Sequence, residues 1–209
     1  MSYVLQDPCD HFFSQANLQC LVDYGHLILE NALPASLITM LGRQSLDMRS
    51  EGLFQTAGIS RGKDHHVAAL TRSDIICWWD PLSVVRIQQA FWHFIQGLRL
   101  QLNRHLFLGL HDAELHYAIY PCGAFYGKHL DRFRSSNLRK ISLVLFLNET
   151  WAEEDGGHLR LYDDDGRSYR DVLPKGGVLV LFFSDRVLHE VRPTNRERLS
   201  LTGWFRTRP

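Results

Sequence analysis

The segment RKISLVLFLNETWAEEDGGHLRLY, residues 139–162, shows the pattern that decides the fold: two apolar runs separated by a polar turn containing Asp155-Gly156-Gly157. Short runs rich in apolar and β-branched residues between glycine-containing turns are typical of β-strands. The pattern extends in both directions and divides residues 115–206 into eight strand-like runs. These are ELHYAIY, AFYGKHLD, RKISLVLFLN, GGHLRLYD, SYRDVLP, GGVLVLFF, VLHEVRP and RLSLTGWF. They predict an antiparallel sandwich or barrel with a closed interior.

Residues 1–114 show helical periodicity instead. Apolar residues recur at near-helical spacing before Gly25, again from Pro34 towards Met48, and in a wide stripe after Pro81. The last stripe consists of Val84, Val85, Ile87, Phe91, Phe94, Ile95, Leu98 and Leu102. We expect these helices to pack on the outside of a sheet, in an α+β, mainly β protein.

A single domain over residues 1–209 is expected, because no repeat, low-complexity tract or linker divides the chain. Residues 1–114 would form the helical support and residues 115–206 the β core. The polar, glycine-containing segment of about 51–71 is predicted to be a mobile loop, since long irregular segments in compact domains are usually functional or mobile.

Composition bears on partners and compartment. Lys+Arg and Asp+Glu both number 23, so the net charge is zero and no nucleic-acid or anionic membrane partner is indicated. The chain has neither a signal-peptide pattern nor an apolar run long enough to span a bilayer. The four cysteines lack CxxC spacing, and we expect them to be reduced. A cytoplasmic location is therefore expected.

A metal site is predicted from three side chains. His129 and Asp131 are two residues apart in GKHLDRF, so both would point to the same face of a strand. His189 follows the apolar run GGVLVLFF, and a second strand could bring its imidazole to the same point. Two histidines and one carboxylate form the facial triad that holds non-haem Fe(II) and leaves positions open for chemistry.

An anion site is predicted next to it. In the last strand-like run, Arg198, Thr202 and Trp204 share one face, while Leu199 and Leu201 share the other. If the first face is the inner one, a guanidinium lies inside the barrel, and a buried Arg needs an anion to offset its desolvation. A small-molecule carboxylate fits this requirement.

Taken singly, each signal has an ordinary structural explanation. His129 and Asp131 fit an exposed loop pair, His189 a hydrogen-bonded core histidine, and Arg198 a surface strand charge. Their combination in one order, with Thr202 in phase with Arg198, favours the metal and anion sites.

These motifs, in the order YPCGAFYGKHLD, LNETWAEEDGGHLRLY, VLFFSDRVLHEVRP and RLSLTGW, resemble the 2-oxoglutarate- and Fe(II)-dependent oxygenases. The chain is most similar to the prolyl hydroxylases that modify hypoxia-inducible factor and to their bacterial relatives. Upstream, RSDIICWW (residues 72–79) resembles the strand after the substrate-covering loop of that group, so that the likeness covers about residues 50–205. The resemblance implies a double-stranded β-helix core, also described as a jelly-roll or cupin-like fold.

The resemblance also implies residue roles. His129, Asp131 and His189 would hold Fe(II), and Arg198 would bind the distal carboxylate of 2-oxoglutarate, assisted by Tyr120 and Thr202. The positions that match substrate-binding positions are Tyr126, Arg139, Trp204, Arg72 and Asp74. One departure is Phe146, which stands where close relatives have a second tyrosine that bonds the cosubstrate, so about 1 kcal/mol of hydrogen bonding is expected to be missing.

The activity implied is hydroxylation of a prolyl residue in a protein substrate, with dioxygen consumed, succinate and carbon dioxide released, and ascorbate as a candidate reductant. For bacterial relatives the resemblance points to translation elongation factor Tu as substrate. Two alternatives stay open. One is an oxidative demethylase of nucleic-acid bases, for which Arg132, Arg134, Arg139 and Lys140 form a local basic cluster. The other is a non-catalytic, metal-binding jelly-roll sensor.

Overall fold

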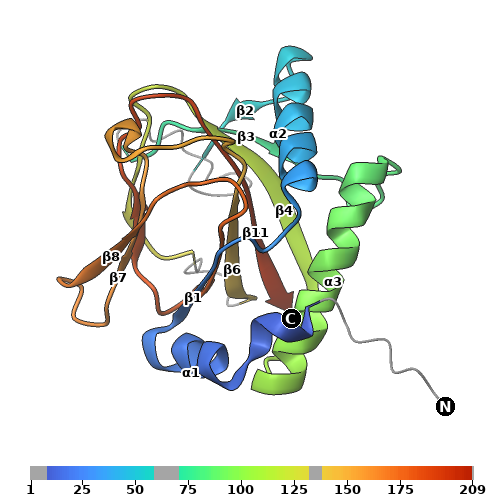
Figure 1. The fold of residues 1–209 in the computed structure, drawn as a ribbon, viewed down its shortest axis with the longest axis vertical. Helices are drawn as coiled ribbons and strands as arrows, with labels where there is room; N and C mark the ends of the chain where they lie inside the picture. Colours follow the sequence, from blue (N-terminus) through green and yellow to red (C-terminus); the bar gives the residue numbers. More distant parts are fainter. Residues whose placement is uncertain (1–8, 59–70, 132–137, 209) are drawn as a thin grey trace.

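The computed structural model describes residues 9–58, 71–131 and 138–208, and within them the strands form two antiparallel sheets (Figure 1). In spatial order, the seven-stranded sheet consists of β1 (His26–Leu29), β9 (Leu179–Phe183), β6 (Arg139–Phe146), β11 (Arg198–Thr207), β4 (Leu110–Tyr120), β3 (Ile75–Trp78) and β2 (Gln55–Thr56). The four-stranded sheet consists of β5 (Tyr126–His129), β10 (His189–Val191), β7 (Leu159–Tyr162) and β8 (Tyr169–Val172).

One apolar cluster lies between the two sheets, and another lies between the seven-stranded sheet and the helices. Between the sheets lie, among others, Val144, Phe146, Leu161 and Val180. On the opposite face of the seven-stranded sheet, residues such as Leu143, Leu145, Leu181 and Leu201 join the cluster shared with the helices. The central strands are therefore buried on both faces, which explains the nearly continuous apolar runs in their sequences.

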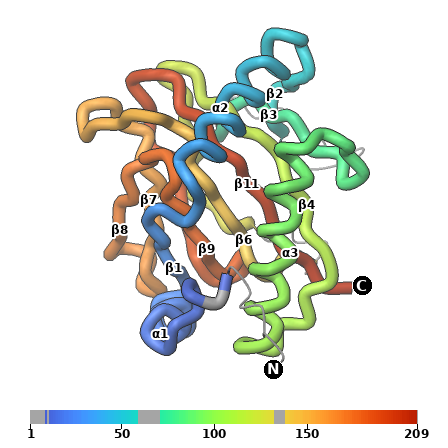
Figure 2. Tube along the Cα trace, turned by 45° about the vertical axis from the view of Figure 1, so that its right-hand side comes forward, coloured from blue at the N-terminus to red at the C-terminus, as the bar shows by residue number. Residues whose placement is uncertain are grey.

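Within the described residues, three α-helices precede the eight C-terminal strands: α1 (Gln15–Tyr24), α2 (Ala35–Ser50) and α3 (Arg86–Leu106). Figures 1 and 2 show α2 and α3 on one side of the seven-stranded sheet and β7 and β8 on the far side. The apolar stripe of α3 buries Phe91, Ile95, Leu98 and Leu102 completely. Gly25 ends α1 in the left-handed conformation, with φ 76°, as its position after the helix predicts.

The mainly β architecture with external helices, predicted from sequence, is confirmed: the eight strand-like runs correspond to β4–β11. The boundaries differ in two places. β4 begins at Leu110 rather than near residue 115. β3 lies within residues 72–79, where the resemblance implies a strand, and with β1 and β2 it extends the seven-stranded sheet, so residues before 115 supply strands as well as helices. Val84 and Val85 precede α3 and are exposed, since the helix begins only at Arg86.

The predicted loop of about 51–71 lies partly outside the described residues, which resume at Thr71. Its described beginning contains a turn at Glu51–Gly52 and strand β2, which pairs with β3. Mobility of this loop and the single-domain division of residues 1–209 stay predictions. In the described ranges, no helix is both long enough and apolar enough to cross a bilayer.

Candidate active site

Two neighbouring strands of the four-stranded sheet bring the predicted metal ligands together. His129 at the end of β5 and His189 at the start of β10 are direct register partners, and Asp131 follows two residues after His129. Asp131 Oδ1 lies 3.5 Å from His129 Nε2 and 3.7 Å from His189 Nε2. One ligand atom from each side chain lies within 4.8 Å of the others, an arrangement that can hold a metal ion.

Both imidazoles present the same nitrogen to this point. Nδ1 of His129 lies 2.7 Å from the carbonyl oxygen of Gly127, and Nδ1 of His189 lies 3.0 Å from that of Val187. A carbonyl only accepts, so each Nδ1 donates and leaves Nε2 with a lone pair for a metal. Burial, together with the charge of His129, lowers the pKa of His189 to about 4, which favours the neutral, ligating form.

Asp131 is held from its other side by serines that the sequence analysis did not identify. Ser142 donates to Asp131 Oδ2 at 2.7 Å, and the Ser184 hydroxyl lies 2.8 Å from that of Ser142. Burial opposes ionisation of Asp131, but His189, His129 and Ser142 outweigh it, and its pKa is lowered well below the ordinary value. A signal was present, because Ser142 is the one polar residue within the run ISLVLF.

Arg198 begins β11 and points into the space between the sheets. Its side chain is only 1% exposed, and its Nε has no hydrogen-bond partner among the described residues. The guanidinium lies 4.8 Å from the ring centre of Tyr120 and 4.9 Å from that of Phe146, and Nη1 reaches Ser200 Oγ only at 3.4 Å. Burial lowers the pKa of Arg198 to about 10. A buried cation with an unpaired donor fits an incoming carboxylate.

Of the two residues predicted to assist Arg198 in cosubstrate binding, one lies on the adjoining strand and the other on the same strand. Tyr120 is its register partner on β4 and is buried, and Thr202 is partly buried four residues along β11. Gly157, at φ 67°, packs against the arginine stem, and a Cβ there would lie 3.0 Å from Arg198 Cδ. The turn before β7 therefore needs glycine at this position for Arg198 to keep its place.

The predicted residues Tyr126, Arg72 and Asp74 form one stack above His129. The Tyr126 ring lies parallel to the His129 ring, with centroids 3.6 Å apart, and the Arg72 guanidinium lies 4.1 Å from the Tyr126 centroid. Arg72 makes two hydrogen bonds, of 2.7 and 2.6 Å, to the fully buried Asp74. Burial raises the pKa of Tyr126 to about 12, so its hydroxyl stays protonated.

Arg139 and Trp204 lie together on the same inner surface. The Arg139 guanidinium lies 3.5 Å from the centre of a Trp204 ring and donates to Glu114 from Nε at 2.8 Å. Its charge is thus already compensated, which does not favour the basic cluster as a phosphate site. The other arginines of that cluster, Arg132 and Arg134, lie outside the described residues.

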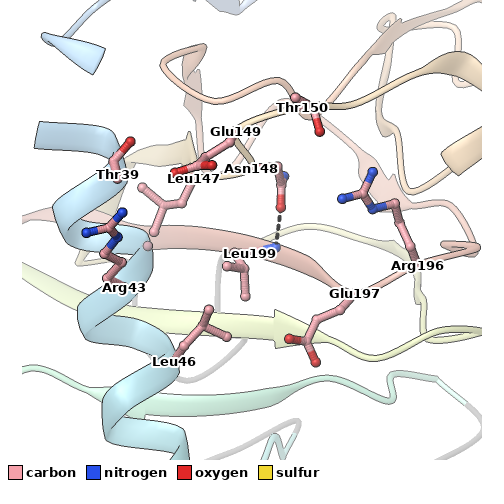
Figure 3. A pocket seen from close by; sticks show the side chains of 11 residues that line it. Thr39, Arg43, Leu46, Leu147, Asn148, Glu149, Thr150, Arg196, Glu197 and Leu199 are labelled. Carbon is pink, nitrogen blue, oxygen red and sulfur yellow. Dashed lines mark hydrogen bonds between the residues drawn. The ribbon is translucent and has the colours of Figure 1, made fainter. Parts of the chain in front are cut away.

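A groove of about 480 Å³ lies elsewhere, between α2 and the segments that follow β6 and precede β11 (Figure 3). Its lining includes the apolar side chains of Leu46, Leu147 and Leu199 and the charged side chains of Arg43 and Arg196. It contains none of the predicted site residues. Asn148, which donates to Pro174 and accepts from the Leu199 backbone, ties this groove to the start of β11.

Comparisons with known proteins agree with this geometry. Residues 115–206 match the family model described as the 2OG-Fe(II) oxygenase superfamily. The structure is similar to the crystal structure of a Pseudomonas putida prolyl-4-hydroxylase, with a TM-score of 0.83 and 42% identity, covering 93% of this chain and 99% of that one. It is also similar to a Trichoplax adhaerens prolyl hydroxylase in complex with a hypoxia inducible factor oxygen degradation domain peptide fragment, with a TM-score of 0.80 and 25% identity, covering 92% and 88%.

Among curated proteins, the hypoxia-inducible factor prolyl hydroxylase of Caenorhabditis elegans is 28% identical over 212 residues. The match covers 93% of this chain but only 28% of that protein, so the chain spans less than a third of the length of this relative. The Pseudomonas putida match, in contrast, extends over nearly the whole of the solved chain. The chain therefore belongs to the prolyl hydroxylases of the 2OG-Fe(II) oxygenase superfamily.

Proposed function

We propose that this chain uses Fe(II), 2-oxoglutarate and dioxygen to hydroxylate a prolyl residue of a protein substrate. The proposal rests on two features that lie in the same space between the sheets. One is the group of possible metal ligands His129, Asp131 and His189, and the other is the buried guanidinium of Arg198, whose Nε is unpaired among the described residues. A metal site alone fits many functions. The unpaired cation beside it fits a cosubstrate with a carboxylate at the far end from its metal-binding group.

The residues have separate tasks in this reaction. His129 and His189 bind the metal through Nε2 in a fixed tautomer, and Asp131 supplies the anionic ligand. When bound, Fe(II) and 2-oxoglutarate supply the oxidising chemistry, in which the 2-oxo acid becomes succinate and carbon dioxide and one oxygen atom enters a substrate C–H bond. Arg198, with Tyr120 and Thr202, would orient the cosubstrate. The protein's own contribution is positioning and exclusion of water rather than proton transfer.

The substrate side of the pocket would be formed by Tyr126, Arg139 and Trp204, with Arg72 and Asp74 at its edge. The support is their position: Tyr126 stacks on the ligand His129, and Trp204 lies opposite Ser142 in the β6–β11 register. As the specific substrate we propose translation elongation factor Tu, and as the location of the protein the cytoplasm. Both stay predictions, as does ascorbate as reductant.

The test is direct. The purified chain is incubated with Fe(II), 2-oxoglutarate, ascorbate and elongation factor Tu or other proline-containing polypeptides, and peptides are searched for a gain of one oxygen on proline. Asp131→Ala is the inactive control, and succinate is measured in parallel. Oxygen on proline with the intact chain supports the proposal. Metal binding without succinate formation would favour the sensor alternative. Loss of methyl groups, released as formaldehyde, from a methylated oligonucleotide incubated in parallel would favour the demethylase.

A further inference from the structure

The hydrogen bonds behind Asp131 connect the two sheets at the metal site. Ser142 lies within β6 of the seven-stranded sheet, and Ser184 directly follows β9 of the same sheet. Asp131 follows β5 of the four-stranded sheet. Both serines are completely buried, so no bulk water competes for their hydroxyls.

The direction of this chain follows from proton counting. Ser142 donates its hydroxyl proton to Asp131 Oδ2 in the 2.7 Å bond. A hydroxyl has one proton, and Ser142 must therefore accept in its 2.8 Å contact with Ser184. The order is Ser184 to Ser142 to Asp131, and donation by Ser184 strengthens the second bond by polarising the Ser142 hydroxyl.

The two oxygens of Asp131 thus have different surroundings. Oδ1 faces Nε2 of both histidines, at 3.5 and 3.7 Å, whereas Oδ2 is engaged by Ser142 on the side of the other sheet. If Oδ2 also turned to the metal, the carboxylate would take a second coordination position. An octahedral ion would then keep room for a chelating 2-oxo acid but none for dioxygen.

We propose that Ser142, supported by Ser184, is a positioning residue that keeps Asp131 monodentate and thereby preserves an open coordination position. The inference rests on metal binding at the site, which the proposed function shares. It assigns to these serines a role distinct from simple packing, because a packing role requires their volume but not their hydroxyl protons.

The test compares matched variants. Ser142→Ala removes the donor, Ser142→Thr keeps a hydroxyl, and Ser184→Ala removes only the support. Ser45→Ala is the control, since Ser45 is also completely buried but lies on α2 and has no hydrogen-bond partner among the described residues for its hydroxyl. Manganese(II) affinity is measured from the free ion by electron paramagnetic resonance. Binding of nitric oxide, an analogue of dioxygen, is measured by the same method on anaerobic protein saturated with iron(II) and 2-oxoglutarate.

Loss of a partner that orients a metal ligand typically weakens metal binding about 10- to 100-fold, and we expect a loss of this size for Ser142→Ala. Ser184→Ala should lose about 2- to 10-fold, as for one neutral hydrogen bond. Ser142→Thr should recover most of the loss, and nitric oxide should bind more weakly to iron(II)- and 2-oxoglutarate-saturated Ser142→Ala than to the parent, because the second oxygen of Asp131 would then compete for the open position. Ser45→Ala should match the parent chain.

Two results would overturn the inference: Ser142→Ala that binds manganese and nitric oxide as the parent does, or Ser142→Thr that is as impaired as Ser142→Ala. If Ser142→Ala does not fold, Ser184→Ala decides instead. A manganese affinity of Ser184→Ala equal to that of the parent would then overturn the inference. A parent chain that binds no manganese would instead remove the proposed function itself, so the two failures are distinguishable.

Discussion

His129 and His189 face each other as direct register partners of β5 and β10, with ring centroids 4.2 Å apart. Because the two strands are antiparallel neighbours, the distance between the imidazoles is set by the sheet itself and not by a loop. Asp131 lies two residues after His129, and its carboxylate reaches the same point. Two of the three proposed metal ligands are therefore held in place by paired strands before any metal binds.

Replacing Asp131 by Ala should abolish stabilisation by metal. In the parent chain, manganese(II) at about 100 times its Kd should raise the free energy of unfolding by about 2.7 kcal/mol, because the ion binds only the folded state. The measurement is chemical denaturation with and without metal. Asp164→Ala is the control, since this carboxylate is exposed and pairs with Arg186. An equal metal effect in Asp131→Ala and the parent would contradict the ligand assignment.

Replacing Arg198 by Met should stabilise the chain in the absence of 2-oxoglutarate. The guanidinium is buried with an unpaired Nε, and apolar replacement of a buried charge is often stabilising by about 1–4 kcal/mol. Calorimetry should show that the variant no longer binds 2-oxoglutarate in the presence of manganese. Arg206→Met, on the same strand, removes a cation that is paired with Asp112 and Glu114, and should bring no such gain. If Arg198→Met were less stable than the parent and bound 2-oxoglutarate normally, the assignment of Arg198 as the cosubstrate-binding cation would be wrong.

Replacing Phe146 by Tyr should strengthen cosubstrate binding. The Phe146 ring lies 4.9 Å from the Arg198 guanidinium, so an added hydroxyl would reach the region where the carboxylate is expected. One additional hydrogen bond of about 1 kcal/mol corresponds to roughly fivefold tighter 2-oxoglutarate binding. Calorimetry on manganese-loaded protein measures it. Weaker binding would mean that the completely buried site has no space for the oxygen atom.

Replacing Phe107 by Gly should stabilise the fold. Phe107 ends α3 in the left-handed conformation, at φ 52° and ψ 36°, while its side chain is 89% exposed. Relief of this strain should exceed the entropic cost of glycine and add about 0.5–1 kcal/mol to the free energy of unfolding. Leu82→Gly also removes an exposed apolar side chain, but Leu82 is not among the residues with positive φ. This variant should therefore not raise the free energy of unfolding. Equal effects of the two variants would argue against backbone strain.

Replacing His26 by Gln should reduce the acid sensitivity of the metal-free chain. Burial lowers the pKa of His26, against the opposing hydrogen bond to the Tyr24 carbonyl. The unfolded state then binds more protons than the native state, so the free energy of unfolding falls as the pH drops below about 6.5. Denaturation curves at pH 7 and at about pH 5 should show a smaller drop for the variant. Parallel pH profiles for both proteins would contradict this assignment.

The strands, and the side chains that come together at the candidate metal site, could be predicted because their signals are local. Each strand-like run after residue 115 has its own apolar pattern and turn residues, and the spacing of His129 and Asp131 alone places both on one face. Arg198 was predictable for the same reason, from its phase with Thr202 along a single strand.

The residues that the sequence did not reveal depend on long-range register. Ser142 meets Asp131 and Ser184 only because β6, β9 and the end of β5 come together in space. The ion pair of Arg139 with Glu114 likewise joins β6 and β4, which come to lie on either side of β11 only in the folded sheet. At the start of α3, the apolar pattern extended to Val84 and Val85, but apolarity does not say where a helix begins.

The most direct test of the central claim is a crystal structure of the chain grown without oxygen, with manganese(II) and 2-oxoglutarate. We expect the ion to be bound by Nε2 of His129, Oδ1 of Asp131 and Nε2 of His189, and the distal carboxylate of 2-oxoglutarate to contact Arg198. An ion held by other residues, or a cosubstrate whose carboxylate does not contact Arg198, would contradict it.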